Sequence, residues 1–228
     1  MSDMELLYAD KRIAVAVKPP GILSTDEPGG MPELLRRQLG TPCIRTVHRL
    51  DAATGGVMVF ARSAAAASIL SGQVRDHQFR KTYLAVVRGD PGHSGTWRDL
   101  LGRDPVRRRT VVAQEPGPDV RPAELDFQRL ASRDGLSLVR ITLHTGRTHQ
   151  IRVHFASIGH PLAGDDLYGG RRDRIGRQAL HCAKQTFRVP EYTEVPDGIC
   201  IRTPVSAGTG RTVTVESPLP QDMADLLS

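Results

Sequence analysis

Short apolar or alternating segments, separated by turns that contain glycine and proline, recur along this 228-residue chain. Successive side chains of a β-strand point to opposite faces, so such segments predict strands with at least one buried face. They are Leu6–Ala9 and Ile13–Lys18, residues 79–89, 123–130, 136–144 and 212–215, and a strand beginning at Leu180. Neighbouring runs with short connections should pair antiparallel. The pattern predicts a large, mainly antiparallel mixed sheet.

Helix signals occupy only a small part of the chain. Met31–Leu39 carries leucines on one side and is followed by Gly40, and Ser63 is a suitable N-cap for a helix through His77. Further helices are expected over residues 148–157 and after Pro218. Residues 89–102 and 115–122 are predicted loops, the second a possible subdomain hinge. The fold class is therefore α+β, with helices flanking the sheet.

Composition limits the classes of partner. Hydrophobic residues make up 39% and charged residues 25% of a chain with net charge +6, as in a globular protein suited to a polyanion. No basic leader precedes an apolar run, and no apolar run approaches the ~20 residues of a membrane helix, so a cytoplasmic location is expected. Cys43, Cys182 and Cys200 are widely spaced, which predicts reduced thiols and no zinc knuckle.

The residues with the most chemical character lie at 48–60, where a polar loop precedes a short apolar strand. His48 and Arg49 come just before Leu50 and the carboxylate of Asp51, and Gly55-Gly56 follow. Loops held by buried strands are common places for reactive groups. An aspartate that merely caps a turn explains the same pattern, because Asp near Gly is ordinary in turns.

Two further stretches combine an aromatic or basic residue with a strand or helix. Tyr83 follows Arg80-Lys81, and alternation places it with Lys81 and Ala85 on one side of a strand. Residues 144–154 contain histidines at every fifth position, a spacing that turns them to different faces of a helix or strand and argues against a metal site. A helix from Thr148 would instead place His149, Arg152 and Ala156 on one face.

These three stretches together resemble the RluA-like family of RNA pseudouridine synthases. His48-Arg49-Leu50-Asp51, with Thr54-x-Gly56 after it, is similar to the family's signature, and Arg-Lys-x-Tyr and Thr145-Gly-Arg-Thr-His-Gln-Ile-Arg152 are similar to its second and third motifs. Lys18-Pro-x-Gly21, His160-Pro-x-x-Gly-Asp165-x-x-Tyr168-Gly and the segment after Pro218 match further family motifs. The resemblance covers nearly the whole chain.

The resemblance implies two subdomains around a basic active-site cleft and isomerisation of uridine to pseudouridine. It makes Asp51 the catalytic residue, Tyr83 the partner of the flipped base and Arg152 the partner of Asp51, whereas Asp165 and Tyr168 are expected to be structural. Asp51 acts either as a nucleophile at ribose carbon 1 or as a base at carbon 2. The sites expected to bind the substrate are His48, Arg49, Arg147, His149 and Ile151, with Arg49 as the wedge in the vacated stack.

The resemblance also implies that no cofactor or metal is needed. Residues 1–228 are expected to be a single catalytic domain and a monomer without the family's small N-terminal RNA-binding module. The expected partner is a stem-loop of large-subunit rRNA, with tRNA as the alternative and no membrane. The basic runs at 107–109 and 171–177 either contact phosphates or are solvated surface. A non-catalytic RNA-binding assembly factor on this fold is the rival interpretation, and it predicts loss of Asp51, Tyr83 or Arg152.

Overall fold

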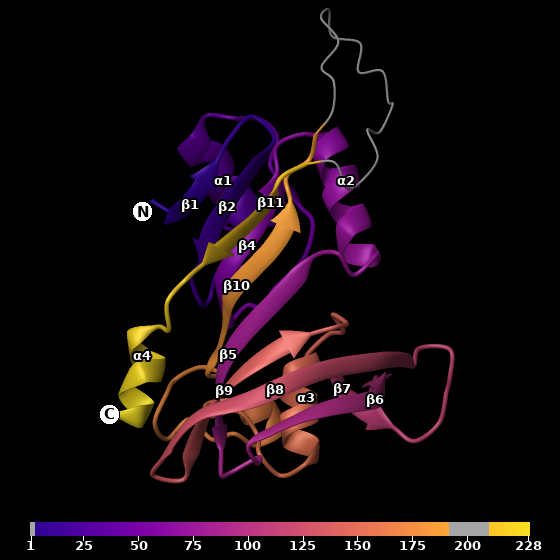
Figure 1. The fold of residues 1–228 in the computed structure, drawn as a ribbon, viewed down its shortest axis with the longest axis vertical. Helices are drawn as coiled ribbons and strands as arrows, with labels where there is room; N and C mark the ends of the chain where they lie inside the picture. The colour runs from indigo at the N-terminus through magenta and orange to yellow at the C-terminus, as the bar shows by residue number, and fades with distance from the viewer. Residues whose placement is uncertain (1–2, 192–209) are drawn as a thin grey trace, which may run out of the picture. The chain divides into compact units, whose positions relative to one another are not determined.

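The computed structural model describes residues 3–191 and 210–228 and divides into two compact units (Figure 1). Unit 1 comprises Met1–Arg80 and Lys184–Ser217, and unit 2 comprises Lys81–Ala183 and Pro218–Ser228. The expected division into two subdomains is therefore confirmed. The basic cleft between them stays a prediction.

Unit 1 is built on a sheet with strand order β1-β2-β4-β10, in which β11 lies beside β10 and β3 pairs with β4. Its elements are β1 (Leu6–Ala9), β2 (Ile13–Lys18), α1 (Met31–Leu39), β3 (Arg45–Thr46), β4 (Gly55–Ala61), α2 (Ala64–Arg75), the end of β10 (Leu180–Arg188) and β11 (Thr212–Glu216). β2 and β4 are antiparallel, from Ile13 opposite Ala61 to Lys18 opposite Gly56. All of β4 is buried, so this sheet is covered on both faces where the strand after the candidate site lies.

The core of unit 1 forms where alternate residues of β2 and β4 meet α2. Val15, Val57 and Val59 pack with Leu70 of α2 and Phe187 of β10. Burying a side chain of this size stabilises the fold by roughly 1.5–3 kcal/mol. β4, the strand that follows Asp51, and its neighbour β2 are thus fixed in one rigid sheet.

The helix predictions for unit 1 are confirmed. α1 ends at Gly40, whose left-handed φ of 57° is easily adopted only without a side chain. Ser63 caps α2 by accepting a hydrogen bond from the backbone N–H of Ala66, and α2 ends at Arg75, two residues before the predicted end. The strands predicted at 6–9, 13–18 and 212–215 are present as β1, β2 and β11.

Unit 2 is a sheet of neighbouring antiparallel strands in the order β5-β9-β8-β6-β7. Its elements are β5 (Arg80–Arg88), β6 (Ser94–Asp104), β7 (Arg109–Ala113), β8 (Arg121–Arg133), β9 (Leu136–Leu143), α3 (Gln150–Ser157), a 3-10 turn η1 (Asp166–Tyr168), the start of β10, α4 (Gln221–Ala224) and η2 (Asp225–Leu227). The first residue of β5, Arg80, still belongs to unit 1. The predicted pairing of the strands at 123–130 and 136–144 is confirmed by β8 and β9.

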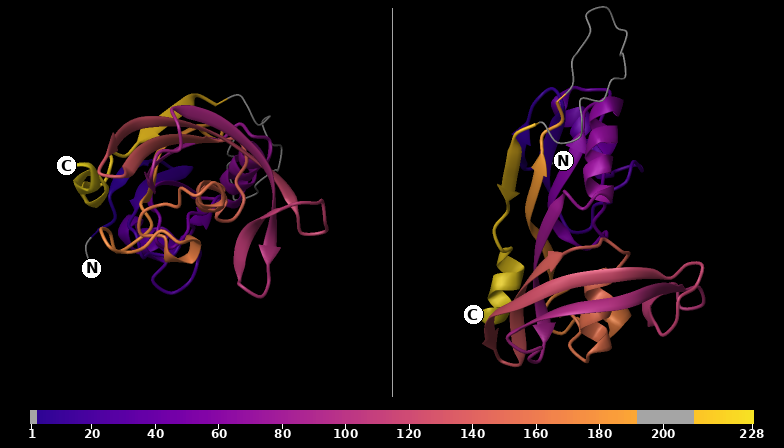
Figure 2. Two further views of the ribbon diagram at one scale, coloured as in Figure 1. Left: turned by 90° about the horizontal axis from the view of Figure 1, so that it is seen from below. Right: turned by 45° about the vertical axis from the view of Figure 1, so that its right-hand side comes forward.

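Aromatic side chains join α3 to this sheet. The ring of Phe155 on α3 lies edge-on to Trp97 of β6 at 4.7 Å and to Phe127 of β8 at 5.6 Å. Figure 2 shows α3 beside these strands. Edge-to-face aromatic pairs add roughly 0.5–1.5 kcal/mol to the free energy of burial. The aromatic cluster therefore fixes the helix on which Arg152 lies.

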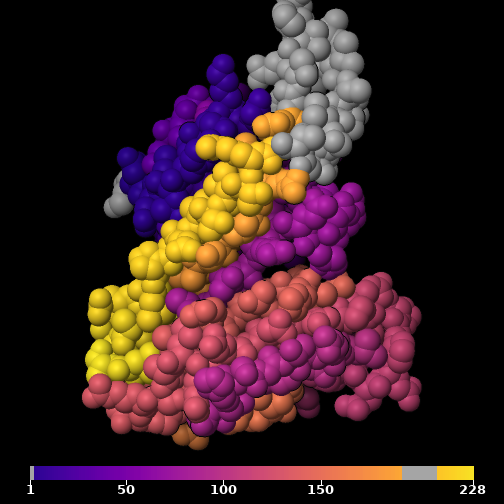
Figure 3. All heavy atoms as spheres, in the orientation of Figure 1, coloured from indigo at the N-terminus to yellow at the C-terminus, as the bar shows by residue number. Residues whose placement is uncertain are grey.

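One loop prediction and one hinge prediction in this unit are wrong. Residues 94–102 of the predicted loop 89–102 belong to β6, which pairs with both β7 and β8 and lies at the surface of unit 2 (Figure 3). The glycines and proline before it indicated turns, but ladder hydrogen bonds to two neighbours outweigh that local preference. The loop at 115–122 connects β7 with β8 inside unit 2, so it is no subdomain hinge.

The ends of the described chain follow the sequence pattern. A short helix, α4, forms after Pro218, as predicted.

The cysteines and the helix lengths were also predicted from the sequence. Cys43 and Cys182 are not disulfide-bonded in the described part of the chain, and Cys200 lies outside it. None of the helices formed by residues 3–191 and 210–228 is long and apolar enough to cross a membrane.

Candidate active site

Asp51 lies in a tight turn directly before β4. Its carbonyl oxygen accepts a hydrogen bond from the N–H of Thr54 at 2.9 Å, and the residue is half-buried, whereas Thr54 and all of β4 are buried. The backbone at Asp51 is thus fixed at its C-terminal side by a strand that cannot shift without disrupting the core of unit 1.

Ser24 fixes the residue that precedes Asp51. Its buried hydroxyl donates to the carbonyl of Leu50 at 2.7 Å and accepts from the N–H of Leu50 at 3.1 Å. One side chain therefore satisfies both backbone groups of Leu50, which would otherwise be buried without partners. Nothing in the sequence pattern indicated this role for Ser24.

Lys18 fixes the residue that follows Asp51. Its side chain is fully buried at the end of β2, and its ammonium donates to the carbonyls of Pro19 (3.0 Å), Ile22 (2.7 Å) and Ala52 (2.8 Å). The N–H of Gly21 donates to the same Ala52 oxygen at 2.8 Å. Lysine is almost never fully buried without partners for its charge. The sequence indicated Lys18-Pro-x-Gly21 only as a turn that resembles a further family motif, so this contact to the Asp51 loop was missed.

The two residues before Leu50 lie in different environments. Nε2 of His48 accepts from the N–H of Val59 at 3.2 Å, and the buried ring lies 5.3 Å from the ring of Phe79. Its contacts here are to the core of unit 1. Arg49 is exposed. Substrate contact by His48 and Arg49 stays a prediction, and the exposed guanidinium of Arg49 is the more accessible of the two.

In unit 2, Tyr83 and Arg152 lie on β5 and α3. Tyr83 is buried on the same side of its strand as Ala85, as alternation predicted. Arg152 forms a two-bonded ion pair with Asp165: Nε and Nη2 donate to the two carboxylate oxygens at 2.7 and 2.8 Å. The side chains are only 7% and 1% exposed. Pairing of Arg152 with Asp51 stays a prediction, whereas Asp165 is its observed partner.

Tyr168 forms a second support for Arg152. The Arg152 guanidinium lies 5.1 Å from the centre of the Tyr168 ring. The phenol accepts from the N–H of Thr110 at 3.1 Å and donates to the carbonyl of Thr110 at 3.0 Å, and it lies 3.0 Å from Nδ1 of His149. Burial raises the pKa of Tyr168, which keeps the phenol protonated and able to donate.

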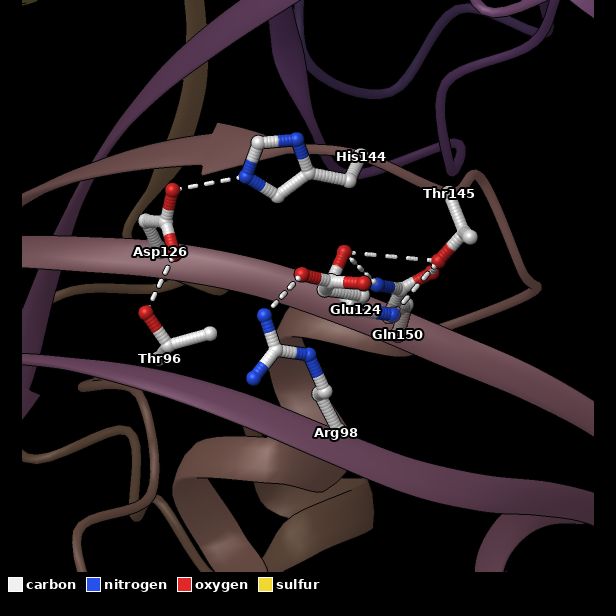
Figure 4. Close-up of polar contacts among 7 residues, drawn as sticks. All are labelled: Thr96, Arg98, Glu124, Asp126, His144, Thr145 and Gln150. Atoms are coloured by element: carbon white, nitrogen blue, oxygen red, sulfur yellow. Dashed lines mark hydrogen bonds and ion pairs between the residues drawn. The ribbon is translucent and has the colours of Figure 1, made fainter.

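The start of α3 is tied to β8 by Gln150 (Figure 4). The Gln150 amide donates to the carbonyl of Glu124 at 3.0 Å and accepts from the hydroxyl of Thr145 and the N–H of Arg147, both at 2.9 Å. The carbonyl of Glu124 also accepts from the backbone N–H of Thr145, and the backbone N–H of Glu124 donates to the Thr145 hydroxyl. These bonds set the position from which α3 carries Arg152.

The predicted helix from Thr148 is two residues too long at its start. His149 precedes α3 with a left-handed φ of 55° and is therefore outside the helix, so it does not share a helical face with Arg152 and Ala156. Arg147 donates from Nε to the carbonyl of Pro122 at 2.9 Å, and Ile151 is buried. Substrate binding by Arg147, His149 and Ile151 stays a prediction.

The three histidines of this stretch contact different groups. Nε2 of His144 lies 2.6 Å from Asp126, which also accepts from the hydroxyl of Thr96 at 2.6 Å (Figure 4). The Thr96 hydrogen bond and then the His144 contact lower the pKa of Asp126. His149 contacts Tyr168 and His154 lies in the core, so the three rings serve separate parts of unit 2.

His154 is buried near one carboxylate. Its Nε2 lies 3.7 Å from Oδ2 of Asp99, and neither ring nitrogen has a hydrogen-bond partner among the described residues. Burial lowers the pKa of His154, and the opposing effect of Asp99 is smaller. The folded protein therefore disfavours the imidazolium relative to the unfolded chain.

His154 should make folding pH-dependent. Because the folded pKa is lowered, the unfolded chain takes up the proton first, and stability present above the ordinary value of 6.5 is lost as pH falls below it. His154→Phe should flatten unfolding free energy against pH between 7.5 and 5, by up to about 1.4 kcal/mol per pH unit. Denaturant titrations at several pH values measure this slope. His93→Gln, at an exposed position, serves as control and should keep the wild-type slope of unfolding free energy against pH. An unchanged slope in His154→Phe would show that burial of His154 does not make folding pH-dependent.

The basic run at 107–109 lies in the turn from β6 to β7. Arg107 and Arg108 are exposed, and Arg107 has a loose contact of 3.9 Å with Asp104. Arg109 donates to the carbonyl of Leu167 at 3.2 Å and lies 5.8 Å from the centre of the Tyr168 ring, so it is partly built into the fold. Within this run, Arg107 and Arg108 are therefore the two arginines whose side chains are exposed and available for phosphate contact.

The run at 171–177 is also divided. Arg172 pairs with Asp166 at 2.7 Å, and Arg177 pairs with Asp222 through two bonds of 2.8 Å. These two arginines hold η1 and α4 to the loop. Much of the charge in this run is used within unit 2.

The geometry can be compared with known proteins. Residues 12–157 match the sequence model of the family described as RNA pseudouridylate synthase. The chain is 35% identical to the Bacillus subtilis uncharacterized RNA pseudouridine synthase YhcT, over 98% of this chain and 71% of that protein. It is 31% identical to ribosomal large subunit pseudouridine synthase D of Neisseria meningitidis, over 99% of this chain and 60% of that protein.

Two further matches agree. The chain is 36% identical to the dual-specificity RNA pseudouridine synthase RluA of Yersinia pestis, over 83% of this chain and 94% of that protein. The solved structure of human RNA pseudouridylate synthase domain containing 1 superposes with a TM-score of 0.73 at 28% identity, over 95% of this chain and 83% of that one. The chain therefore belongs to the RluA-like family of RNA pseudouridine synthases, isomerases that convert uridine in RNA to pseudouridine.

Proposed function

We propose that this pseudouridine synthase modifies uridine in a stem-loop of large-subunit rRNA and that Asp51 is its catalytic residue. The observation that carries the role of Asp51 is the double clamp on its loop: Ser24 holds Leu50 and Lys18 holds Ala52. A carboxylate whose neighbours on both sides are fixed is prepared for chemistry before RNA binds. An aspartate that only caps a turn would not need two buried side chains to position it.

The reaction needs only bonds of the substrate itself. The bond between N1 of uracil and ribose carbon 1 breaks, the base turns, carbon 5 bonds to the sugar, and the proton on carbon 5 leaves while N1 gains one. We propose that Asp51 acts at the sugar, either as nucleophile at carbon 1 or as base at carbon 2. No redox step or group donor is involved, so activity should persist in EDTA.

Tyr83 and Arg152 have supporting roles in this proposal. An aromatic face offers a base taken from its helix roughly 1–3 kcal/mol of stacking. A guanidinium close to a carboxylate favours its charged form. Tyr83 would hold the uracil while it turns, Arg152 would orient Asp51, and Arg49 would fill the space that the base leaves.

The rRNA substrate rests on the relatives. One of the matches reported above is named for the large ribosomal subunit and another for dual specificity. The alternative substrate is tRNA. The test is transcriptome-wide pseudouridine mapping in the native organism with and without this gene. Loss of a site in large-subunit rRNA is the expected result; loss confined to tRNA would overturn the rRNA assignment and leave the chemistry intact.

Residues 1–228 should act as one catalytic domain, as a monomer in the cytoplasm. The net charge of +6 suits a single chain that binds a polyanion directly. Light scattering of the enzyme with and without a stem-loop RNA measures the stoichiometry. A mass of twice 24.9 kDa for the free protein would contradict the monomer.

The exposed arginines at the β6–β7 turn should contribute phosphate contacts. Replacing Arg107 and Arg108 with glutamine should flatten log K against log[salt] by about 0.7 per lost contact on single-stranded RNA. Filter binding at several salt concentrations measures the slope. Arg75 and Arg133 form a matched control pair, because both are exposed and have similarly loose acidic neighbours at 3.4 and 3.8 Å. An equal change of the salt slope in both double variants would show that the effect comes from net charge and not from phosphate contacts at this turn.

A further inference from the structure

The ion pair between Arg152 and Asp165 is almost fully buried, with side chains 7% and 1% exposed. Asp165 takes the N–H groups on Nε and Nη2, one edge of the guanidinium. Arginine has five N–H donors in a rigid plane, so a carboxylate on one edge leaves the Nη1 group to serve a second acceptor. The plane and direction of that second edge are then fixed by Asp165.

A second restraint acts on the face of the same guanidinium. The Tyr168 ring lies below Arg152, and the backbone of Thr110 on β7 holds the phenol by two hydrogen bonds. Asp165 immediately precedes η1 and Tyr168 is its last residue, and the N–H of Tyr168 donates to the carbonyl of Asp165 at 3.1 Å. The edge and the face of Arg152 are thus held by one short segment of the chain.

We propose that Asp165, supported by Tyr168, is a positioning residue for pseudouridine formation: it holds Arg152 in the plane needed to orient Asp51. This inference rests on the proposed function of Asp51 and Arg152. Asp165 is itself 2% exposed, so it does not touch the RNA. Its effect passes through Arg152, and it should therefore change turnover more than substrate affinity.

A double-mutant cycle tests this coupling. Asp165→Asn and Arg152→Lys should each lower the single-turnover rate constant about 100-fold, because small misplacements near the chemistry have effects of this order. The double variant should be no slower than the slower single variant, within about 3-fold, since groups that act as a unit are non-additive. A double variant slower by the product of both effects would overturn the inference.

Single-turnover kinetics with excess enzyme separates positioning from folding. A protein that is partly unfolded needs more total enzyme to saturate the RNA but keeps the rate constant at saturation, whereas a misplaced Arg152 lowers the rate constant at saturation itself. KM should stay within about 3-fold of wild type. Asp165→Glu keeps the charge and should recover part of the rate; an equal loss in Asp165→Asn and Asp165→Glu would argue for shape alone and against positioning through the ion pair.

The chain offers a matched control in the same unit. Arg177 and Asp222 of α4 form a pair with the same two-bond geometry, at 2.8 Å for both bonds. Asp222→Asn should leave the rate constant within about 2-fold of wild type, as expected for a partly exposed pair. A fall like that of Asp165→Asn would show that any lost ion pair in unit 2 slows the enzyme, and it would overturn the inference.

The two proposals fail in different ways. If Asp51→Asn is inactive and the cycle is additive, the role of Asp165 is wrong and the proposed function stands. If Asp51→Asn retains activity, the proposed site is wrong whatever the cycle shows.

Discussion

Replacing Asp51 with asparagine should abolish pseudouridine formation while RNA binding is kept. Asparagine preserves the size of the side chain and its hydrogen bonding, but it removes the charge and most of the nucleophilicity. Affinity depends mainly on phosphate contacts and RNA shape, so the dissociation constant should change little. The turn itself uses the backbone of Asp51, whose carbonyl accepts from Thr54, and this bond is unaffected by the change.

The measurement is pseudouridine content in native rRNA and tRNA, with filter binding of the same RNA. The control is Asp76→Asn at the exposed C-terminus of α2 in the same unit, which should keep wild-type turnover. Product formation by Asp51→Asn at more than about a tenth of the wild-type rate, equivalent to less than ~1.4 kcal/mol in the barrier, would refute the catalytic role.

Replacing Lys18 with methionine should destabilise unit 1 strongly. The carbonyls of Pro19, Ile22 and Ala52 would each lose a charge-assisted hydrogen bond, and each such bond contributes roughly 1.5–3 kcal/mol. Methionine avoids the cost of burying an ammonium, which offsets part of the loss. We expect the free energy of unfolding to fall by about 3 kcal/mol.

Denaturant unfolding followed by circular dichroism measures this loss. The control is Lys184→Met, which removes an exposed pair with Glu216 and should cost less than about 1 kcal/mol. If Lys18→Met costs no more than Lys184→Met, the clamp on Ala52 contributes nothing to the fold. Because Lys18 holds the residue next to Asp51, turnover of the folded fraction should also decrease.

Local pattern was sufficient wherever one segment determines its own structure. Helix α1 with its terminal Gly40, helix α2 with its Ser63 cap and the pairing of β8 with β9 follow from capping, periodicity and short connections. Where local and non-local preferences disagree, the prediction from local pattern was wrong. The glycines in and before β6 predicted a loop, but hydrogen bonds to β7 and β8 make this segment a strand.

The sequence by itself determined the chemistry of this protein: the family, the Asp51 loop before a buried strand, and the likeness of Tyr83 and Arg152 to functional positions. Only the tertiary structure decided what holds those residues. Lys18 is 34 positions from Ala52, Ser24 is 26 from Leu50, and Arg152 is 13 from Asp165. No period or cap connects residues so far apart. Their partnership arises because folding removes water from these polar groups, and each must then find a partner that the chain brings near.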